Sequence, residues 1–120
     1  YMEENPGAPF VTEVKDASSK LQSATMWLMQ QGMADGEQAG AAATPYLRLF
    51  ALTAVAFFWS RMALLAQQQL EAGTTETDFY QAKIHSGQFF VSRILPQASS
   101  LLAEIESGKD NLMAMTEAQF

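Results

Sequence analysis

Apolar residues are densest between residues 46 and 70, a segment without Gly or Pro that is rich in Leu, Ala and Gln. These residue types favour helices, so the segment predicts one long helix. Its apolar positions are not confined to a single stripe, because Phe57, Phe58 and Trp59 follow one another and point in different directions on a helix. A helix that is apolar nearly all round is expected to be buried nearly all round. We therefore expect this helix to be the central member of the fold.

A second helical pattern precedes this segment, from Phe10 to about Met33. Apolar residues recur there at spacings of four and three, which places them on one side of a helix. These residues are Phe10, Val14, Ala17, Leu21, Ala24 and Leu28. Asp35 is a candidate cap for the next helix, which either runs through Pro45 or begins at Pro45 with Thr44 as its cap. The Ala-rich composition of residues 39–43 favours the longer helix.

A third helix is expected to begin at about Glu76 and to be kinked at Pro96, since proline lacks a backbone donor and crowds the preceding turn. Gly73 and Gly108 are expected to end the second and third helices. The sequence thus predicts an all-α fold, a three-helix up-down antiparallel bundle with long helices. Residues 1–9 read as a linker and residues 10–120 as a single domain. A short fourth helical segment is possible at the C-terminus, with Leu112, Met113 and Met115 folding back onto the bundle.

Charge and composition exclude several classes of function. The formal net charge is -6 and the seven Lys and Arg residues form no cluster, which argues against nucleic-acid binding. The uncharged run between Arg48 and Arg61 has twelve residues, whereas a membrane span needs about 20. No membrane span is therefore predicted. The absence of Cys and of a signal-peptide pattern fits a cytoplasmic protein.

Candidate chemistry is sparse. His85 is the only histidine, and Asp78 lies two helical turns from it, about 10 Å away and too far to hydrogen-bond. We therefore predict no catalytic, cofactor-binding or metal-binding residue in this chain. The Met residues and the two Trp residues are interpreted as core filling, and a ligand pocket is the alternative.

Two charges lie on the central helix, Arg48 and Arg61, and each is expected to pair with a carboxylate such as Glu37, Glu71 or Asp78 or to reach an interface. Two flanking helices cannot cover the whole circumference of this helix, so some aromatic surface is expected to remain for a partner. The predicted interface residues are Arg48, Phe57, Phe58, Trp59, Arg61 and Met62.

Three stretches resemble a known family: AGAAATPYLRLFALTAVAFFWSRMALLA, FYQAKIHSGQFFVSRILPQ and SGKDNLMAMTEAQF. Together they resemble the extra C-terminal helical domain of bacterial acyl-CoA dehydrogenases of the 3-methylmercaptopropionyl-CoA dehydrogenase type. The likeness is most specific at residues 46–50, 89–96 and 112–120. Ala51 stands where members of that family often have Gly.

The resemblance implies a parent enzyme that uses FAD to oxidise an acyl-CoA to the 2,3-enoyl-CoA, with its catalytic glutamate and flavin contacts in upstream domains. It implies that this chain binds no cofactor itself, packs on those upstream dehydrogenase domains and helps to form a homo-oligomer. Two alternatives remain open. One is a free-standing helical adaptor or dimerisation module, and the other is a small bundle that binds an acyl chain or lipid.

Overall fold

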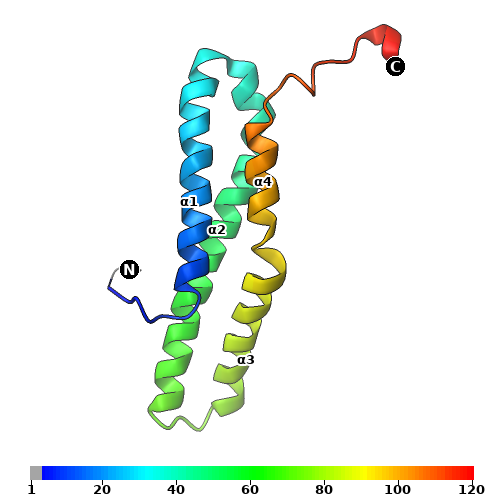
Figure 1. Ribbon diagram of the computed structural model, residues 1–120. Coiled ribbons are helices and arrows are strands. Elements are labelled where there is room, and N and C mark those ends of the chain that lie inside the picture. The colour runs from blue at the N-terminus through cyan, green and yellow to red at the C-terminus, as the bar shows by residue number, and fades with distance from the viewer. Residues whose placement is uncertain (1–3) are drawn as a thin grey trace.

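The computed structural model describes residues 4–120, and the secondary structure of this part is entirely helical. The prediction of an all-α fold is therefore confirmed. In Figure 1 the chain runs up through α1, down through α2 and up again through α3 and α4. The elements are α1 (Val11–Trp27), the π-helical η1 (Leu28–Gly32), α2 (Gly36–Glu71), α3 (Thr77–Phe89), the π-helical η2 (Phe90–Ile94), α4 (Gln97–Glu106) and the 3-10 turn η3 (Glu117–Gln119).

The ends of α2 are set by local chemistry that the sequence predicts. The Asp35 side chain accepts a hydrogen bond of 3.0 Å from the backbone N–H of Glu37, and α2 begins at Gly36. The helix continues through Pro45, which confirms the longer of the two predicted helices. It ends just before Gly73, whose φ of 82° is the left-handed conformation that glycine adopts without strain.

Pro96 interrupts the third helix, as predicted. A proline in an α-helix crowds the carbonyl one turn earlier. Here the helix widens before the proline: the N–H of Leu95 donates to the carbonyl of Phe90 over 2.9 Å, a bond that spans five residues. Helix α3 therefore passes through η2 and a turn before α4 begins at Gln97.

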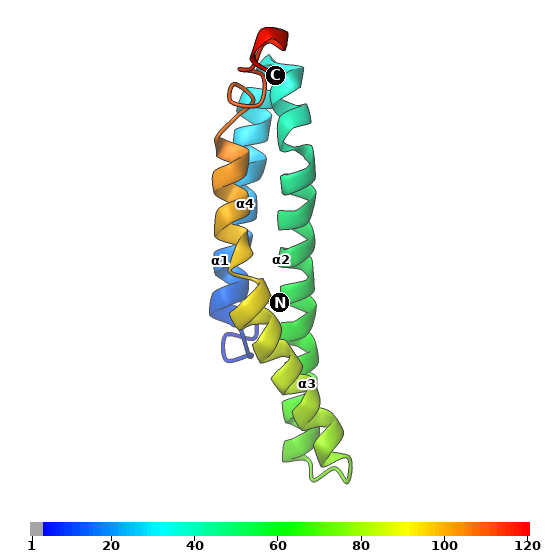
Figure 2. The same cartoon turned by 90° about the vertical axis from the view of Figure 1, so that its right-hand side faces the viewer.

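The helices form a thin plate of two layers. Figure 2 shows α1 and α4 on the same side of α2, with no element on its opposite side. The α-carbons extend over 67 × 31 × 15 Å, and the radius of gyration is 18.8 Å. A compact domain of this length would have a radius of about 14 Å. The expectation that α2 is buried nearly all round is therefore wrong, because a single layer can cover only one side of it.

Two clusters of buried side chains lie between the layers, one around Leu49 and Ile105 and the other around Val14 and Phe90. The predicted inner side of α1 is confirmed, since Val14, Ala17 and Ala24 are buried and the other members of that pattern pack against the clusters. On α2 the buried residues are mostly small, and small residues let neighbouring helices approach closely. They are Ala42, Pro45, Leu49, Thr53, Ala56, Ser60, Ala63 and Ala66.

Two sequence predictions about packing are wrong. Met26 on α1, Met29 on η1 and Met33 just after η1 do not fill the core but are exposed. The C-terminal tail does not fold back: its apolar side chains are exposed, and Figure 1 shows the tail leading away from the other helices. Within the tail, the Thr116 N–H donates to Gln119 Oε1 over 2.8 Å and holds the short turn η3.

The described part of the predicted linker is fixed to the helices. The hydroxyl of Ser60, which is fully buried on α2, donates to the carbonyl of Pro9 over 2.5 Å. Phe10 then adopts a φ of 65° before α1, and its ring lies against Gly87 of α3. Residues 1–3 of the linker lie outside the described residues.

Candidate docking surface

The side of α2 that faces away from α1 and α4 is apolar along most of its length. We call it the outer face of α2. Its side chains recur every three or four residues, the spacing of one helical face, and they lie opposite the small buried residues. Phe58 at the middle of the face is 54% exposed and Leu47 at one end is 67% exposed. The outer face consists of Leu47, Phe50, Ala51, Val55, Phe58, Met62 and Leu65, all exposed.

Two arginines flank this face. Arg48 and Arg61 are both exposed, and the Arg61 guanidinium lies 5.9 Å from the centre of the Phe57 ring. The expected ion pair with Glu37 is wrong, because Glu37 contacts Lys109 instead, at 3.0 Å. Among residues 4–120, the ion pairs join Lys20 to Asp16 and Lys109 to Asp35 and Glu37, and none includes Arg48.

The six predicted interface residues divide into two groups. Arg48, Phe58, Arg61 and Met62 are exposed on or beside the outer face. Phe57 and Trp59 are half-buried at its flanks and pack against the cluster around Val14.

The sequence reasoning missed five members of the face, Leu47, Phe50, Ala51, Val55 and Leu65. The sequence does contain a signal for these residues. Small residues recur on the opposite side of the same helix, and they mark the side that packs against the other helices.

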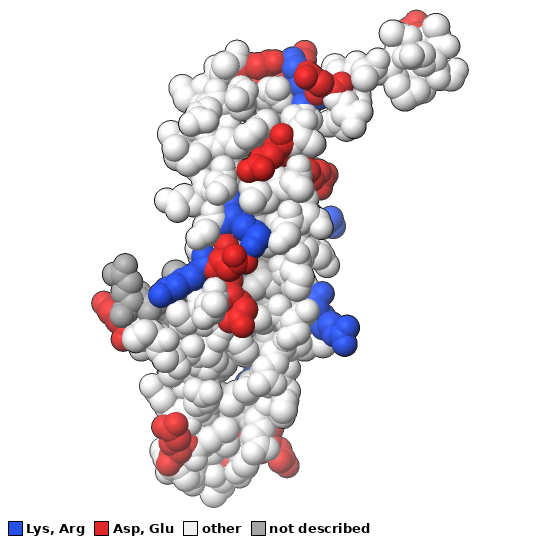
Figure 3. Space-filling view, in the orientation of Figure 1, with Lys and Arg blue, Asp and Glu red and all other residues white. Residues whose placement is uncertain are grey.

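Charged groups lie elsewhere on the molecule. Figure 3 shows acidic and basic side chains interspersed over the side that α1 and α4 present to the viewer. By contrast, the sequence contains no Asp or Glu between Glu37 and Glu71. Arg48 and Arg61 are therefore the charged residues that α2 itself contributes between Glu37 and Glu71.

A polar clamp fixes one end of the plate. Lys109, just after α4, contacts the carboxylates of Asp35 and Glu37 at the start of α2, and its backbone N–H donates to Gln38 Oε1 over 2.9 Å. The hydrogen bond from Lys109 and then that from the Glu37 N–H hold the pKa of Asp35 below its usual value. The same carboxylates, Asp35 first, raise the pKa of Lys109. The clamp ties the start of α2 to the end of α4.

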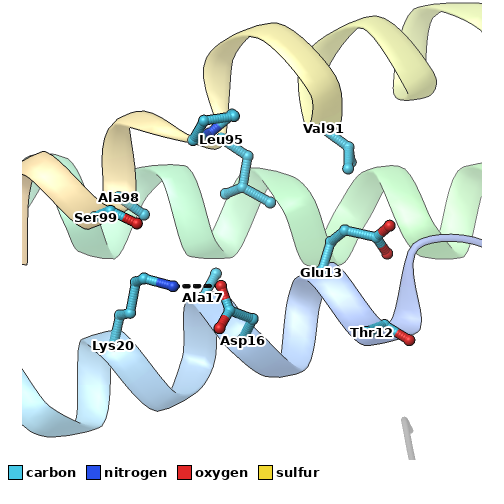
Figure 4. Close-up of a pocket in the computed structure, with 10 residues that line it drawn as sticks. Thr12, Glu13, Asp16, Ala17, Lys20, Val91, Leu95, Ala98 and Ser99 are labelled. Atoms are coloured by element: carbon cyan, nitrogen blue, oxygen red, sulfur yellow. Dashed lines mark hydrogen bonds and ion pairs between the residues drawn. The ribbon is translucent and has the colours of Figure 1, made fainter.

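An open groove runs between α1 and the chain around Pro96 (Figure 4). Its volume is about 430 Å³. Figure 4 shows Leu95 and Val91 extending from one wall towards α1, and the Lys20–Asp16 ion pair on the other wall. Ala17 and Ala98 at its base are buried. These residues offer a shallow apolar contact rather than an enclosed chamber for an acyl chain.

His85 is exposed on α3, where its Nδ1 lies 3.3 Å from Gln88 Oε1. It lines a second groove with Trp59, Ser86, Phe89, Phe90 and Ile94. Within residues 4–120 no group of three or more His, Cys, Asp or Glu side chains could hold a metal ion.

By length and composition alone, α2 could cross a membrane. The mean hydropathy of its most apolar 18-residue window is 1.8, and 33% of that window is buried. Core helices of water-soluble proteins meet the same test, so this finding is weak evidence for a span. The prediction that the chain has no membrane span stays a prediction.

Residues 2–116 match the family described as acetyl-CoA dehydrogenase C-terminal like. No curated protein matches the sequence.

Proposed function

We propose a docking role for this chain, which belongs to the acetyl-CoA dehydrogenase C-terminal-like family. The family match supports an accessory domain of acyl-CoA dehydrogenases. In this proposal the domain packs through the outer face of α2 onto the dehydrogenase domains that precede it in the same polypeptide. It contributes no catalytic residue.

The observation that carries this proposal is the exposed apolar face of a thin molecule. The accessible surface is 7890 Å² for a mass of 13.2 kDa. A compact monomer of that mass would expose about 6,400 Å², so the excess is roughly 1,500 Å². The extended tail accounts for part of this excess. A standard protein interface covers about 800 Å² on each partner, which the remaining excess and the outer face can supply.

The finer parts of the proposal follow from the sequence resemblance. We propose that the parent enzyme is of the 3-methylmercaptopropionyl-CoA dehydrogenase type and uses FAD to oxidise an acyl-CoA to the 2,3-enoyl-CoA. Its flavin and its catalytic base would be held by the upstream domains. We further propose that the helices act as an up-down antiparallel bundle that supports a homo-oligomer in a bacterial cytoplasm.

The test is a charge placed at the centre of the face in the full gene product. Phe58→Asp should release the domain from the rest of the protein, because burying an unpaired carboxylate in an apolar contact is costly. The release should appear as faster proteolysis of the segment that joins this domain to the preceding dehydrogenase domains and as a more extended particle in small-angle scattering. The flavin content should not change.

The matched control is Gln68→Asp, which adds the same charge at an exposed polar position of the same helix. Phe58 is exposed, so the 120-residue chain should keep its circular dichroism in both variants. If Phe58→Asp behaves like Gln68→Asp in the full gene product, the outer face does not dock and the proposal fails.

The dimerisation module is the second candidate, because the same exposed face favours it. It predicts that the 120-residue chain alone forms a discrete dimer in analytical ultracentrifugation and that Phe58→Asp returns it to a monomer.

A further inference from the structure

We infer that residues 8–10 form a rigid joint that sets the position of the preceding polypeptide relative to the outer face of α2. We call these three residues the entry latch. The inference rests on the proposed function and adds to it a device within this chain that positions the docked domains.

The entry latch is fixed at the place where three helices meet. Figure 1 shows α1 beginning part-way along α2, with α3 beside the rest of α2. The Pro9 carbonyl accepts the 2.5 Å hydrogen bond from the buried Ser60 hydroxyl of α2. The Phe10 ring lies against Gly87 of α3 and packs against one of the two core clusters, and Ala8 is buried. The latch is therefore attached to α2 and α3 as well as to α1, which it precedes in the chain.

The backbone of the latch has a conformation that bulky residues rarely adopt. The φ of Phe10 is 65°, in the left-handed region, and such a conformation persists only where the surrounding contacts impose it. In this conformation the Phe10 carbonyl accepts the first hydrogen bond of α1, from the Val14 N–H over 2.9 Å. Gly87 provides the space for the ring, because a Cβ there would lie 2.8 Å from an aromatic carbon of Phe10. These contacts together select one conformation for the latch.

The latch lies level with the centre of the outer face. Ser60 follows Phe58 by two residues, so the two are about 3 Å apart along the helix axis and about 200° apart around it. The preceding polypeptide therefore enters on the packed side of α2 and must pass round one edge of this helix to reach a domain docked on the outer face. A rigid joint fixes that edge and reduces the number of orientations open to the two parts, which strengthens docking without a further contact.

Distances between two spin labels test whether the latch is rigid. The chain contains no Cys, so Gly7→Cys combined with Ala43→Cys provides one labelled pair. Both positions are exposed, and a side chain at residue 7 meets open space. In the 120-residue chain we expect a narrow distance distribution by double electron–electron resonance. An open latch would let residues 7–10 move as a flexible chain and would spread the distances over about 11 Å.

A double substitution should open the latch. Phe10→Ala combined with Ser60→Ala removes the ring on α3 and the hydroxyl that holds the Pro9 carbonyl, and it should broaden the distribution. The control is Phe89→Ala combined with Ser19→Ala, which removes the same atoms at exposed positions of α3 and α1 and should leave the distribution narrow. Circular dichroism checks that the helices are kept. If the first variant loses helix, Ser60→Ala alone is compared with Ser19→Ala alone.

Methionine oxidation in the full gene product then tests whether the latch positions the docked domains. Met62 is on the outer face and 40% exposed, and the exposed Met26 and Met33 normalise the dose of hydrogen peroxide. Docking should slow sulfoxide formation at Met62 at least about tenfold relative to the 120-residue chain, because a docked side chain reacts only after opening. The variant with the open latch should raise the Met62 rate in the full gene product at least about threefold, since its docking is less well oriented. The control variant should leave that rate unchanged.

The outcomes separate the inference from the proposed function. A broad distribution in the unchanged 120-residue chain refutes the latch, while protection of Met62 in the full gene product still supports docking. If the distribution is narrow but opening the latch does not alter Met62 protection, the joint has no positioning role and the inference is overturned. If Met62 reacts equally in the full gene product and in the 120-residue chain, docking fails and the positioning role fails with it.

Discussion

Replacing Leu49 and Leu47 by alanine, one at a time, should separate the packed side of α2 from its open side. Leu49 is fully buried among Ala24, Ala42, Ala98, Leu101 and Ile105, while Leu47, two residues earlier, is 67% exposed. Both changes remove the same atoms from the same helix, so their intrinsic effects on helix formation cancel in the comparison.

The expected costs differ by several kcal/mol. Leu49→Ala removes a buried side chain and leaves a cavity, which costs about 3 kcal/mol in a core that cannot collapse fully. The neighbours of Leu49 include three alanines, whose methyl side chains cannot rotate into the space. Leu47→Ala in the 120-residue chain should stay within about 0.5 kcal/mol of the original protein, as is usual for a surface change.

Urea unfolding followed by circular dichroism measures both differences, and thermal unfolding provides a second reading. At about 2.1 cal/mol/K per residue, 1 kcal/mol shifts the melting temperature of a 120-residue chain by about 4 °C, so Leu49→Ala should lower it by about 12 °C. Equal losses from the two variants would refute the two-layer packing of α2. A larger loss at Leu47 would reverse the assignment of its faces.

The remaining predictions concern backbone fit, pH and the histidine. Gly87→Ala should destabilise the 120-residue chain by about 1 to 2 kcal/mol in urea unfolding, because its Cβ would lie 2.8 Å from an aromatic carbon of the ring packed on α3. Gly40→Ala, with open space around it, should stabilise by up to about 1 kcal/mol, and the opposite ordering would contradict the packing. The clamp should make the melting temperature pH-dependent. Because the pKa of Asp35 is lowered on folding, its contribution is present above its ordinary value of 3.8 and is lost as the pH falls through the lowered pKa. The pKa of Lys109 is raised from 10.5, so its contribution is complete below 10.5 and is lost only as the pH rises through the raised pKa. Lys109→Met should reduce both dependences, and an unchanged pH profile would argue against the clamp. His85→Ala should leave the melting temperature, and any activity of the full gene product, unchanged, and a large loss of activity would show that this exposed side chain has a catalytic partner in another domain.

The sequence predicted the features of the fold that depend on interactions between residues close together in the chain. The inner side of α1 followed from the spacing of Val14, Ala17 and Ala24, and the helix ends followed from Asp35 and Gly73. These features depend on residues close in the chain, so periodicity and capping rules are sufficient to find them.

The sequence did not predict which side of α2 packs. An apolar side chain such as Leu47 or Met62 is equally suited to a core and to a contact with another protein, so hydrophobicity alone cannot separate the two. The prediction that Glu37 could pair with an arginine of α2 was also wrong, because Glu37 contacts Lys109, which is distant in sequence. Both errors concern contacts between elements, and the first depends on the plate having only two layers.

The order of synthesis gives the outer face of α2 a further meaning. A ribosome releases the N-terminal parts of a polypeptide first, and domains generally fold in that order. If the proposed docking site lies upstream, it is already folded when Phe58 leaves the exit tunnel. The outer face of α2 can then dock onto the upstream domains as soon as it emerges. The same segment produced without the upstream domains should instead associate nonspecifically with other proteins and require a chaperone to remain soluble.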